Sequence, residues 1–172
     1  NPSQINIGKF IWGTKSPDQI ELITVQRSNQ EITIETRETK KGLEESTQTL
    51  VLNAKTLEPI RQNYKDENRT YSLQYGSRIK GTNTNYETNK KDNIDEAITG
   101  KHFDTATLPY VISSLPLSLD YRVTLPVIRL NSTWKPTYLR YRITDVSEQK
   151  TFSCLSGVRE FWKVTLNEKT RN

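Results

Sequence analysis

The sequence predicts a mainly β fold: an antiparallel meander that forms a curved half-barrel or barrel-like sheet, capped by one short helix near residues 107–115. Three observations lead to this fold class. Apolar and polar residues alternate with a period of two along most of the chain, turn-forming residues separate the alternating segments, and only 33% of the 172 residues are hydrophobic. A sheet with one buried and one solvated face needs no larger apolar fraction.

Strands are expected where the alternation is rich in β-branched and aromatic residues. In chain order these segments are DQIELITVQ, EITIETRE, TQTLVLN, PIRQNYKDE, RTYSLQYGSRIKG, YRVTLPVIRL, TYLRYRITDV and FWKVTLN. In the first segment Ile23 and Val25 share one face, and in the second Ile32 and Ile34 do. Short strands at this spacing, without long helical patterns between them, predict a meander that is closed or half-closed into a barrel.

The links between the strands carry turn chemistry, as in SPDQ, RSNQE, KKG, KDENR and LNSTWKP. The link from Ser28 to Glu31 predicts a tight hairpin in which Asn29 tolerates a positive φ. Pro59 is expected at the start of a strand, because proline cannot donate to the hydrogen-bond ladder.

The segment from His102 to Ile128 breaks the strand period and holds the single histidine of the chain. Four apolar residues fall at helical spacing in it: Leu108, Val111, Ile112 and Leu115. Pro109 fits only the first turn, which puts the N-cap at about Thr107, and Pro116 ends the helix. A helix of about two turns cannot stand alone in water, so we expect it to cover the concave face of the sheet.

Composition limits the partners of the chain. The net charge is +5, but the basic residues are scattered among acids, so no nucleic-acid partner is expected. The densest basic stretch, with Tyr138, Arg140 and Arg142 on one side, is predicted to be the solvated face of an amphipathic strand. No run approaches the roughly 18 apolar residues of a transmembrane segment. No linker divides the chain, so residues 1–172 are expected to form a single β-rich domain.

Three motifs occur in a fixed order: LVLNAKTLEPIRQNY, FDTATLPYVISSLPLSLDYRVTLPVI and SGVREFWKVTL. In this order they resemble a family of exported bacterial proteins, domain of unknown function 3108, over roughly the last two thirds of the chain. The positions that match the pattern are Thr56, Leu57, Pro59, Phe103, Asp104, Leu108, Pro109, Leu115, Pro116, Leu117, Gly157, Trp162, Lys163 and Val164. Asn53 stands where the family tends to have Asp, and Asp120 where a turn glycine is common.

The resemblance implies Gram-negative export to the periplasm or cell surface, with the signal sequence absent from this chain, and a β-rich fold. It implies no established activity and supplies no catalytic residues. Members usually continue past the WKV strand with a further strand, so in this chain such a partner strand would be missing, disordered or removed.

Candidate catalytic and metal residues are few. His102 and Asp104 point the same way in an extended segment, and with Cys154 they would form the skeleton of a thiol hydrolase. The simpler interpretation makes Cys154 a core residue and His102 a rim residue that hydrogen-bonds the backbone. One histidine and one cysteine fall short of a usual metal-ligand set, so neither a metal nor another cofactor is expected. The tripeptide Asp104–Thr105–Ala106 resembles an O-glycosylation motif of some Bacteroidetes, although helix capping already explains these residues.

Two hypotheses for function remain beside the hydrolase. The first is a non-enzymatic envelope domain that binds an apolar or lipid-like small molecule on the concave face of the sheet. Its pocket or lid would consist of His102, Phe103, Leu108, Val111, Ile112, Leu115 and Leu117. The alternative is a structural or interaction module with a filled core, no ligand and an envelope protein as its partner.

Overall fold

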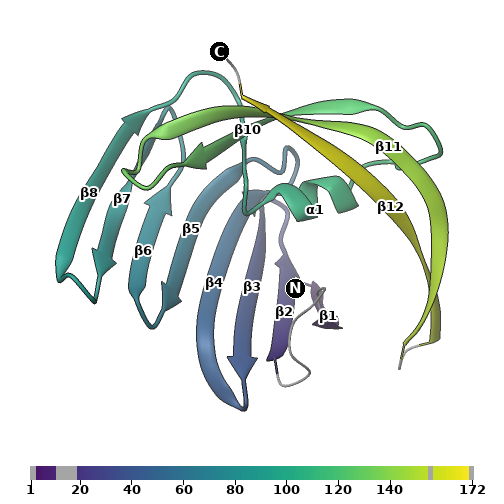
Figure 1. Cartoon of the computed structure of the whole chain (residues 1–172), viewed down its shortest axis with the longest axis horizontal. Coiled ribbons are helices and arrows are strands. Elements are labelled where there is room, and N and C mark those ends of the chain that lie inside the picture. The colour runs from purple at the N-terminus through teal and green to yellow at the C-terminus, as the bar shows by residue number, and fades with distance from the viewer. Residues whose placement is uncertain (1–2, 11–18, 155–156, 171–172) are drawn as a thin grey trace. The chain divides into compact units, whose positions relative to one another are not determined.

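A computed structural model describes the backbone of residues 3–10, 19–154 and 157–170, and the side chains of residues 21–146 and 164–169. The chain divides into two compact units, Asn1–Gly100 and Lys101–Asn172. Strands dominate both units, which confirms the mainly β prediction (Figure 1). The grouping of residues 1–172 into a single domain stays a prediction.

The first unit is an antiparallel meander in which consecutive strands pair in chain order, as Figure 1 shows from purple to teal. Its strands are β1 (Ser3–Phe10), β2 (Gln19–Arg27), β3 (Glu31–Lys40), β4 (Leu43–Asn53), β5 (Pro59–Asp66), β6 (Arg69–Gln74), β7 (Arg78–Asn85) and β8 (Lys90–Ala97). Pro59 begins β5, as expected. The segment RTYSLQYGSRIKG, predicted as one strand, is two strands joined by a turn at Tyr75–Ser77.

The barrel-like alternative of the prediction is wrong. Within the described residues, β1 and β8 lie at opposite ends of the strand order and do not pair with each other, so the sheet is not a closed barrel. The remaining strands form a second sheet instead of continuing the first. Periodicity predicts that a segment is a strand but not which sheet it joins, because any two alternating strands can pair.

Polar side chains and positive φ angles set the hairpins. At the β2–β3 turn, the Ser28 hydroxyl accepts hydrogen bonds from the backbone N–H groups of Gln30 and Glu31, at 3.3 and 3.0 Å. Asn29 has no positive φ, contrary to the prediction; such angles occur instead in the KKG turn, at Lys41 (50°) and Gly42 (80°). Two successive positive φ angles match the twist of a two-residue hairpin.

The side chain of Asn53 holds the link between β4 and β5. Asn53 Oδ1 accepts hydrogen bonds from the N–H groups of Lys55 and Thr56, at 2.9 and 3.0 Å. An Asp carboxylate oxygen in this place could accept the same two bonds. Asn53 therefore sets the geometry of the turn between β4 and β5.

One face of this sheet holds the core of the first unit, and we call it the buried face. Its buried apolar side chains come from β2, β3, β4, β6, β7 and β8: Ile23, Ile34, Leu50, Leu52, Leu73, Ile79 and Ile94. The opposite face is more solvated, and Leu22 on β2 is 51% exposed there. Ile23 and Ile34, which the alternation places on one face of their strands, point to this side of the sheet.

The second unit is a smaller mixed sheet with the order β12-β11-β10-β9. Its elements are β9 (Phe103–Asp104), α1 (Leu108–Ser113), β10 (Val123–Leu130), β11 (Pro136–Cys154) and β12 (Gly157–Thr170). The two residues of β9 pair in parallel with β10, and the other pairs are antiparallel. On β11, Leu139 and Ile143 are buried while Arg140 and Arg142 are exposed, which confirms the amphipathic strand.

The predicted helix exists but is shorter than residues 107–115. It spans Leu108–Ser113, with Thr107 at the N-cap. The Thr107 hydroxyl does not cap the helix, because it donates to the Asp104 carbonyl oxygen at 2.8 Å. Of the four apolar residues at helical spacing, Leu108 and Val111 are buried as expected, whereas Ile112 and Leu115 are only half-buried. Among the described residues, no helix has the length and apolar character that a membrane crossing requires.

Candidate functional site

The residues predicted to form a ligand pocket or lid all lie in the second unit. They belong to the segment before β9, to β9, to α1 and to the loop that follows it. Leu108 and Val111 are buried, and the others are half-buried: His102, Phe103, Ile112, Leu115 and Leu117. Whether these side chains line a pocket stays a prediction.

His102 is oriented by packing. The edge of its ring meets Tyr138 of β11, with 5.1 Å between the ring centroids and 60° between the ring planes. His102 Nδ1 is buried and has no hydrogen-bond partner in the part of the chain that the structure describes. The expected bond to the backbone is therefore not made by this nitrogen. The side chain of Cys154 lies outside the described residues, so the His102–Cys154 pair stays a prediction.

The tripeptide Asp104–Thr105–Ala106 connects β9 to α1. Asp104 is 6% exposed, and its Oδ1 accepts a hydrogen bond from the Ala106 N–H at 2.8 Å. The Thr105 N–H donates to the Ile128 carbonyl oxygen of β10 at 3.2 Å. These bonds give the three residues a structural role in the start of the helix.

A cluster of polar residues that the sequence did not reveal lies on the buried face of the first unit. The strand register aligns this face in three rows across β2–β8. The apolar row consists of Val25, Ile34, Leu50, Gln62, Leu73, Gly81 and Ile94. The tyrosine row consists of Ile23, Thr36, Gln48, Tyr64, Tyr71, Asn83 and Asp92. The charged row consists of Glu21, Glu38, Ser46, Asp66, Arg69, Asn85 and Lys90.

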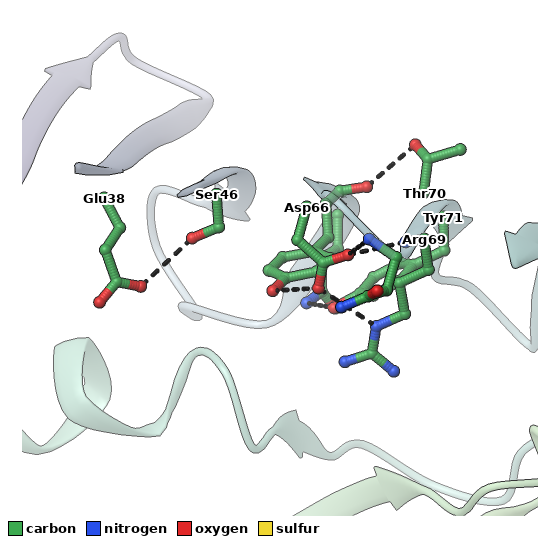
Figure 2. Close-up of polar contacts among 9 residues, drawn as sticks. Glu38, Ser46, Asp66, Arg69, Thr70 and Tyr71 are labelled. Carbon is green, nitrogen blue, oxygen red and sulfur yellow. Dashed lines mark hydrogen bonds and ion pairs between the residues drawn. The ribbon is translucent and has the colours of Figure 1, made fainter. Parts of the chain in front are cut away.

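Neighbouring rows are two residues, or about 7 Å, apart along each strand. The buried face therefore changes from apolar to charged over about 14 Å. Figure 2 shows four members of the charged row, Glu38, Ser46, Asp66 and Arg69. Between β3 and β4, the Ser46 hydroxyl donates to Glu38 Oε2 at 3.3 Å.

Gln62 connects the apolar row to tyrosine side chains. It is only 4% exposed, and its Nε2 donates to the Tyr71 hydroxyl oxygen at 2.9 Å. Its Oε1 accepts from the Tyr75 hydroxyl at 2.8 Å. Both ends of the amide are therefore satisfied, which is what makes a polar side chain tolerable at this depth.

At the β5–β6 hairpin, two stacked tyrosines meet a carboxylate and a guanidinium. The rings of Tyr64 and Tyr71 lie 5.1 Å apart, with 19° between their planes. The Arg69 guanidinium carbon lies 5.4 Å from the centroid of the Tyr64 ring and 5.9 Å from that of Tyr71. The Tyr64 hydroxyl donates to Asp66 Oδ2 at 2.9 Å.

Asp66 fixes the turn of this hairpin. Its Oδ1 accepts hydrogen bonds from the backbone N–H groups of Asn68 and Arg69, at 2.8 and 2.7 Å (Figure 2). Burial alone would raise the pKa of Asp66, but the Tyr64 hydroxyl, the two N–H groups and the Arg69 charge outweigh it and hold that pKa below its ordinary value. Burial, followed by the bond to Asp66, raises the pKa of Tyr64.

Asn83 lies in the tyrosine row on β7 and is 5% exposed. Its Nδ2 donates to Asp92 Oδ2 at 3.2 Å. Asp92 Oδ1 also forms an ion pair with Lys90 Nζ at 2.9 Å. Asn83 Oδ1 is buried and accepts no hydrogen bond from the described residues. Each buried polar atom of this kind needs an explanation, because most are paired in folded proteins.

The cluster was not predicted because it depends on register. The sequence shows that Gln62 and Tyr64 alternate on one strand, and Tyr71 and Leu73 on the next. Only the Glu67–Asn68 turn, held by Asp66, brings Tyr64 opposite Tyr71. In the part of the chain that is described, no group of three or more His, Cys, Asp or Glu side chains could hold a metal ion.

Comparison with known proteins gives one match. The model of a family described as "Protein of unknown function (DUF3108)" matches residues 5–172, more of the chain than the two thirds over which the sequence motifs resemble it. No curated protein and no solved structure matches the chain.

Proposed function

The chain belongs to the DUF3108 family, and on this premise we propose that it is a non-enzymatic exported envelope domain that binds an apolar or lipid-like ligand. The ligand would bind to the buried face of the β1–β8 sheet, which would curve around it as a half-barrel. Export to the periplasm or cell surface is part of the same proposal.

The observation that carries the proposal is the change in polarity along the buried face. Leu50 and Leu73 of the apolar row are 1% and 2% exposed, and two rows away the face ends in Glu38, Asp66 and Arg69. A ligand site is mainly apolar, with a few placed polar groups that fix orientation. From the apolar row to the charged row the face has this composition, and Gln62 adds one buried amide to the apolar row.

The protonation of the hairpin residues favours binding over acid–base chemistry. A general acid or base works best with a pKa near the working pH. The pKa of Asp66 is lowered and that of Tyr64 is raised, so both move away from neutrality. These groups therefore supply fixed donors and acceptors.

We propose separately that α1, an element of the second unit, opens locally. It has six residues, and its N-cap side chain makes no capping hydrogen bond. Elements with few stabilising contacts are among the least stable parts of a fold and unfold locally. Amide hydrogen exchange at Val111 to Leu115 is expected to be faster than in β3 and β4.

The test of the binding function is retention and saturable binding of an acyl chain. Native mass spectrometry of the purified protein, with solvent extraction, is expected to reveal a retained lipid. A fluorescent acyl probe should then compete with it for a single site. An absence of both in folded protein would favour the alternative, a structural or interaction module with a filled core.

A matched pair of variants on β4 locates the site. Gln48 belongs to the tyrosine row, and Thr47 is its neighbour on the opposite face. Gln48→Trp should fill the polar end of the buried face and weaken binding of the acyl probe by about tenfold or more, the effect of losing about 1.4 kcal/mol. Thr47→Trp adds the same bulk to the other face and should leave binding unchanged. Equal effects of both variants would contradict the location.

A further inference from the structure

Resting on the proposed function, we propose that the ligand is an amphiphile with a neutral, hydroxyl-bearing head. The head would bind at the tyrosine row, with Asn83 Oδ1 accepting a hydrogen bond from one of its hydroxyl groups. The apolar chain would lie along the apolar row. Glycerol and sugar head groups share this chemistry.

The orientation of the Asn83 amide sets the type of group that it can bind. An ionised carboxylate only accepts hydrogen bonds, so the amide nitrogen of Asn83 must face Asp92. The amide oxygen is then available as an acceptor, and it is buried without a donor from the described residues. A ligand at this position must therefore bring an O–H or N–H group.

The charges around the row disfavour a charged head. The Asp92 carboxylate is hydrogen-bonded to the Asn83 amide, and the Lys90 ammonium group beside it is already paired with this carboxylate. Lys90 Nζ lies 2.9 Å from Asp92 Oδ1, and Arg69 Nε lies 3.8 Å from Asp66 Oδ2. A phosphate or carboxylate head would have to break these pairs and meet like charge.

An ammonium head is disfavoured by the guanidinium on the tyrosines. Arg69 lies within 6 Å of both ring centroids, at 5.4 and 5.9 Å, where a ligand cation would otherwise bind. A neutral head avoids this repulsion. Tyr71 and Asn83 are directly paired across β6 and β7, so a head held by the Asn83 oxygen would lie beside an aromatic ring.

The experiment compares probes with one octyl chain and different heads, below their micelle concentrations. Octyl glucoside and monooctanoylglycerol carry hydroxyl groups; octanoate, octyl phosphate and octyltrimethylammonium carry charge. Calorimetric titration of the wild-type protein should show about tenfold tighter binding of at least one hydroxyl-bearing probe, the effect expected of one good hydrogen bond. Preference between glucoside and glycerol would identify the source of the head.

Asn83→Leu should abolish this preference, so that the hydroxyl-bearing probes bind no more tightly than octanoate, because leucine keeps the volume and removes the acceptor. Asn93→Leu is the matched control, since Asn93 is exposed on the opposite face of β8. If Asn83→Leu does not fold, the same test can be made with wild-type protein and a modified ligand. Octyl glucoside with methylated hydroxyls cannot donate a hydrogen bond, so it should bind about tenfold more weakly than octyl glucoside itself.

The outcomes separate the two proposals. If no octyl compound binds the folded protein, the proposed function itself fails. If all bind with similar affinity, or a charged head binds most tightly, the acyl site stands and the hydroxyl-bearing head is refuted. Unchanged preference in Asn83→Leu would show that Asn83 Oδ1 takes no part, and that a water molecule at most satisfies it.

Discussion

Replacing Gln62 tests the hydrogen-bond network in the buried face. Gln62→Leu keeps the approximate volume of a side chain that is 4% exposed and removes its two bonds to tyrosine hydroxyls, of 2.9 and 2.8 Å. Each such bond contributes about 0.5–1.5 kcal/mol net, so the loss is about 1–3 kcal/mol. Tyr71 and Tyr75 are half-buried and keep partial access to water, and leucine adds apolar burial. We therefore expect a loss of about 1–2 kcal/mol.

The assay is urea unfolding followed by circular dichroism, combined with double-mutant cycles. Gln62→Leu is paired with Tyr71→Phe and, separately, with Tyr75→Phe, and each cycle should give a coupling of about 0.5–1.5 kcal/mol. Gln74→Leu is the control, because Gln74 is exposed on β6, and it should change stability by less than about 0.5 kcal/mol. Coupling below about 0.3 kcal/mol in both cycles would refute the reasoning, because the bonds would then contribute nothing measurable.

Three further comparisons test other parts of the fold by the same unfolding assay. Leu108→Ala should lower the free energy of unfolding by about 2–5 kcal/mol, because Leu108 is only 7% exposed. Ile112→Ala should lower it by less, because Ile112 is half-buried. A larger loss for Ile112→Ala than for Leu108→Ala would contradict the observed face of α1. Gly81→Ala should destabilise the fold by at least about 1–3 kcal/mol, because the added Cβ would collide with the Ser72 carbonyl oxygen. Gly76→Ala is the control and should be tolerated, because its added Cβ has only the Arg78 carbonyl oxygen nearby, at 3.9 Å. Because the folded-state pKa of Asp66 lies below its ordinary 3.8, Asp66 stabilises the fold above that pH and loses this contribution as the pH falls through the folded-state pKa. The stability gap between wild type and Asp66→Asn should therefore narrow from about pH 5 to about pH 2, and a constant gap would argue against the lowered pKa.

Local chemistry was the part of the fold that the sequence predicted well. The start of β5 at Pro59 and the hairpin at Ser28 follow from single residues, and the shared side of Ile32 and Ile34 on β3 follows from alternation. The N-cap at Thr107 also follows, although the hydroxyl bonds the Asp104 carbonyl oxygen instead of the helix. In each of these cases the deciding residues are within a few positions of one another in the sequence.

Features that depend on distant pairing were not predicted. The division of the strands into two sheets, and the parallel pairing of β9 with β10, require the register of whole strands. The tyrosine row has the same origin, because its members come from seven strands and meet only once six hairpins are aligned. Sequence alternation assigned Tyr64 to a face but could not show that Tyr71 and Asn83 follow it across the sheet.

The chain-ordered pairing of β1 to β8 has a consequence for how the first unit folds. Every strand finds its partner in the next segment of the chain, so the loops that must close are short and their entropic cost is small. Low sequence separation of contacts goes with fast folding. The unit can therefore assemble one hairpin after another while the chain emerges N-terminus first, and β5 can pair with β4 before β8 has left the ribosome. In a β-rich chain whose strands pair with distant segments, each strand would stay unpaired until its partner is synthesised. Its exposed edge could meanwhile pair with other chains and cause aggregation.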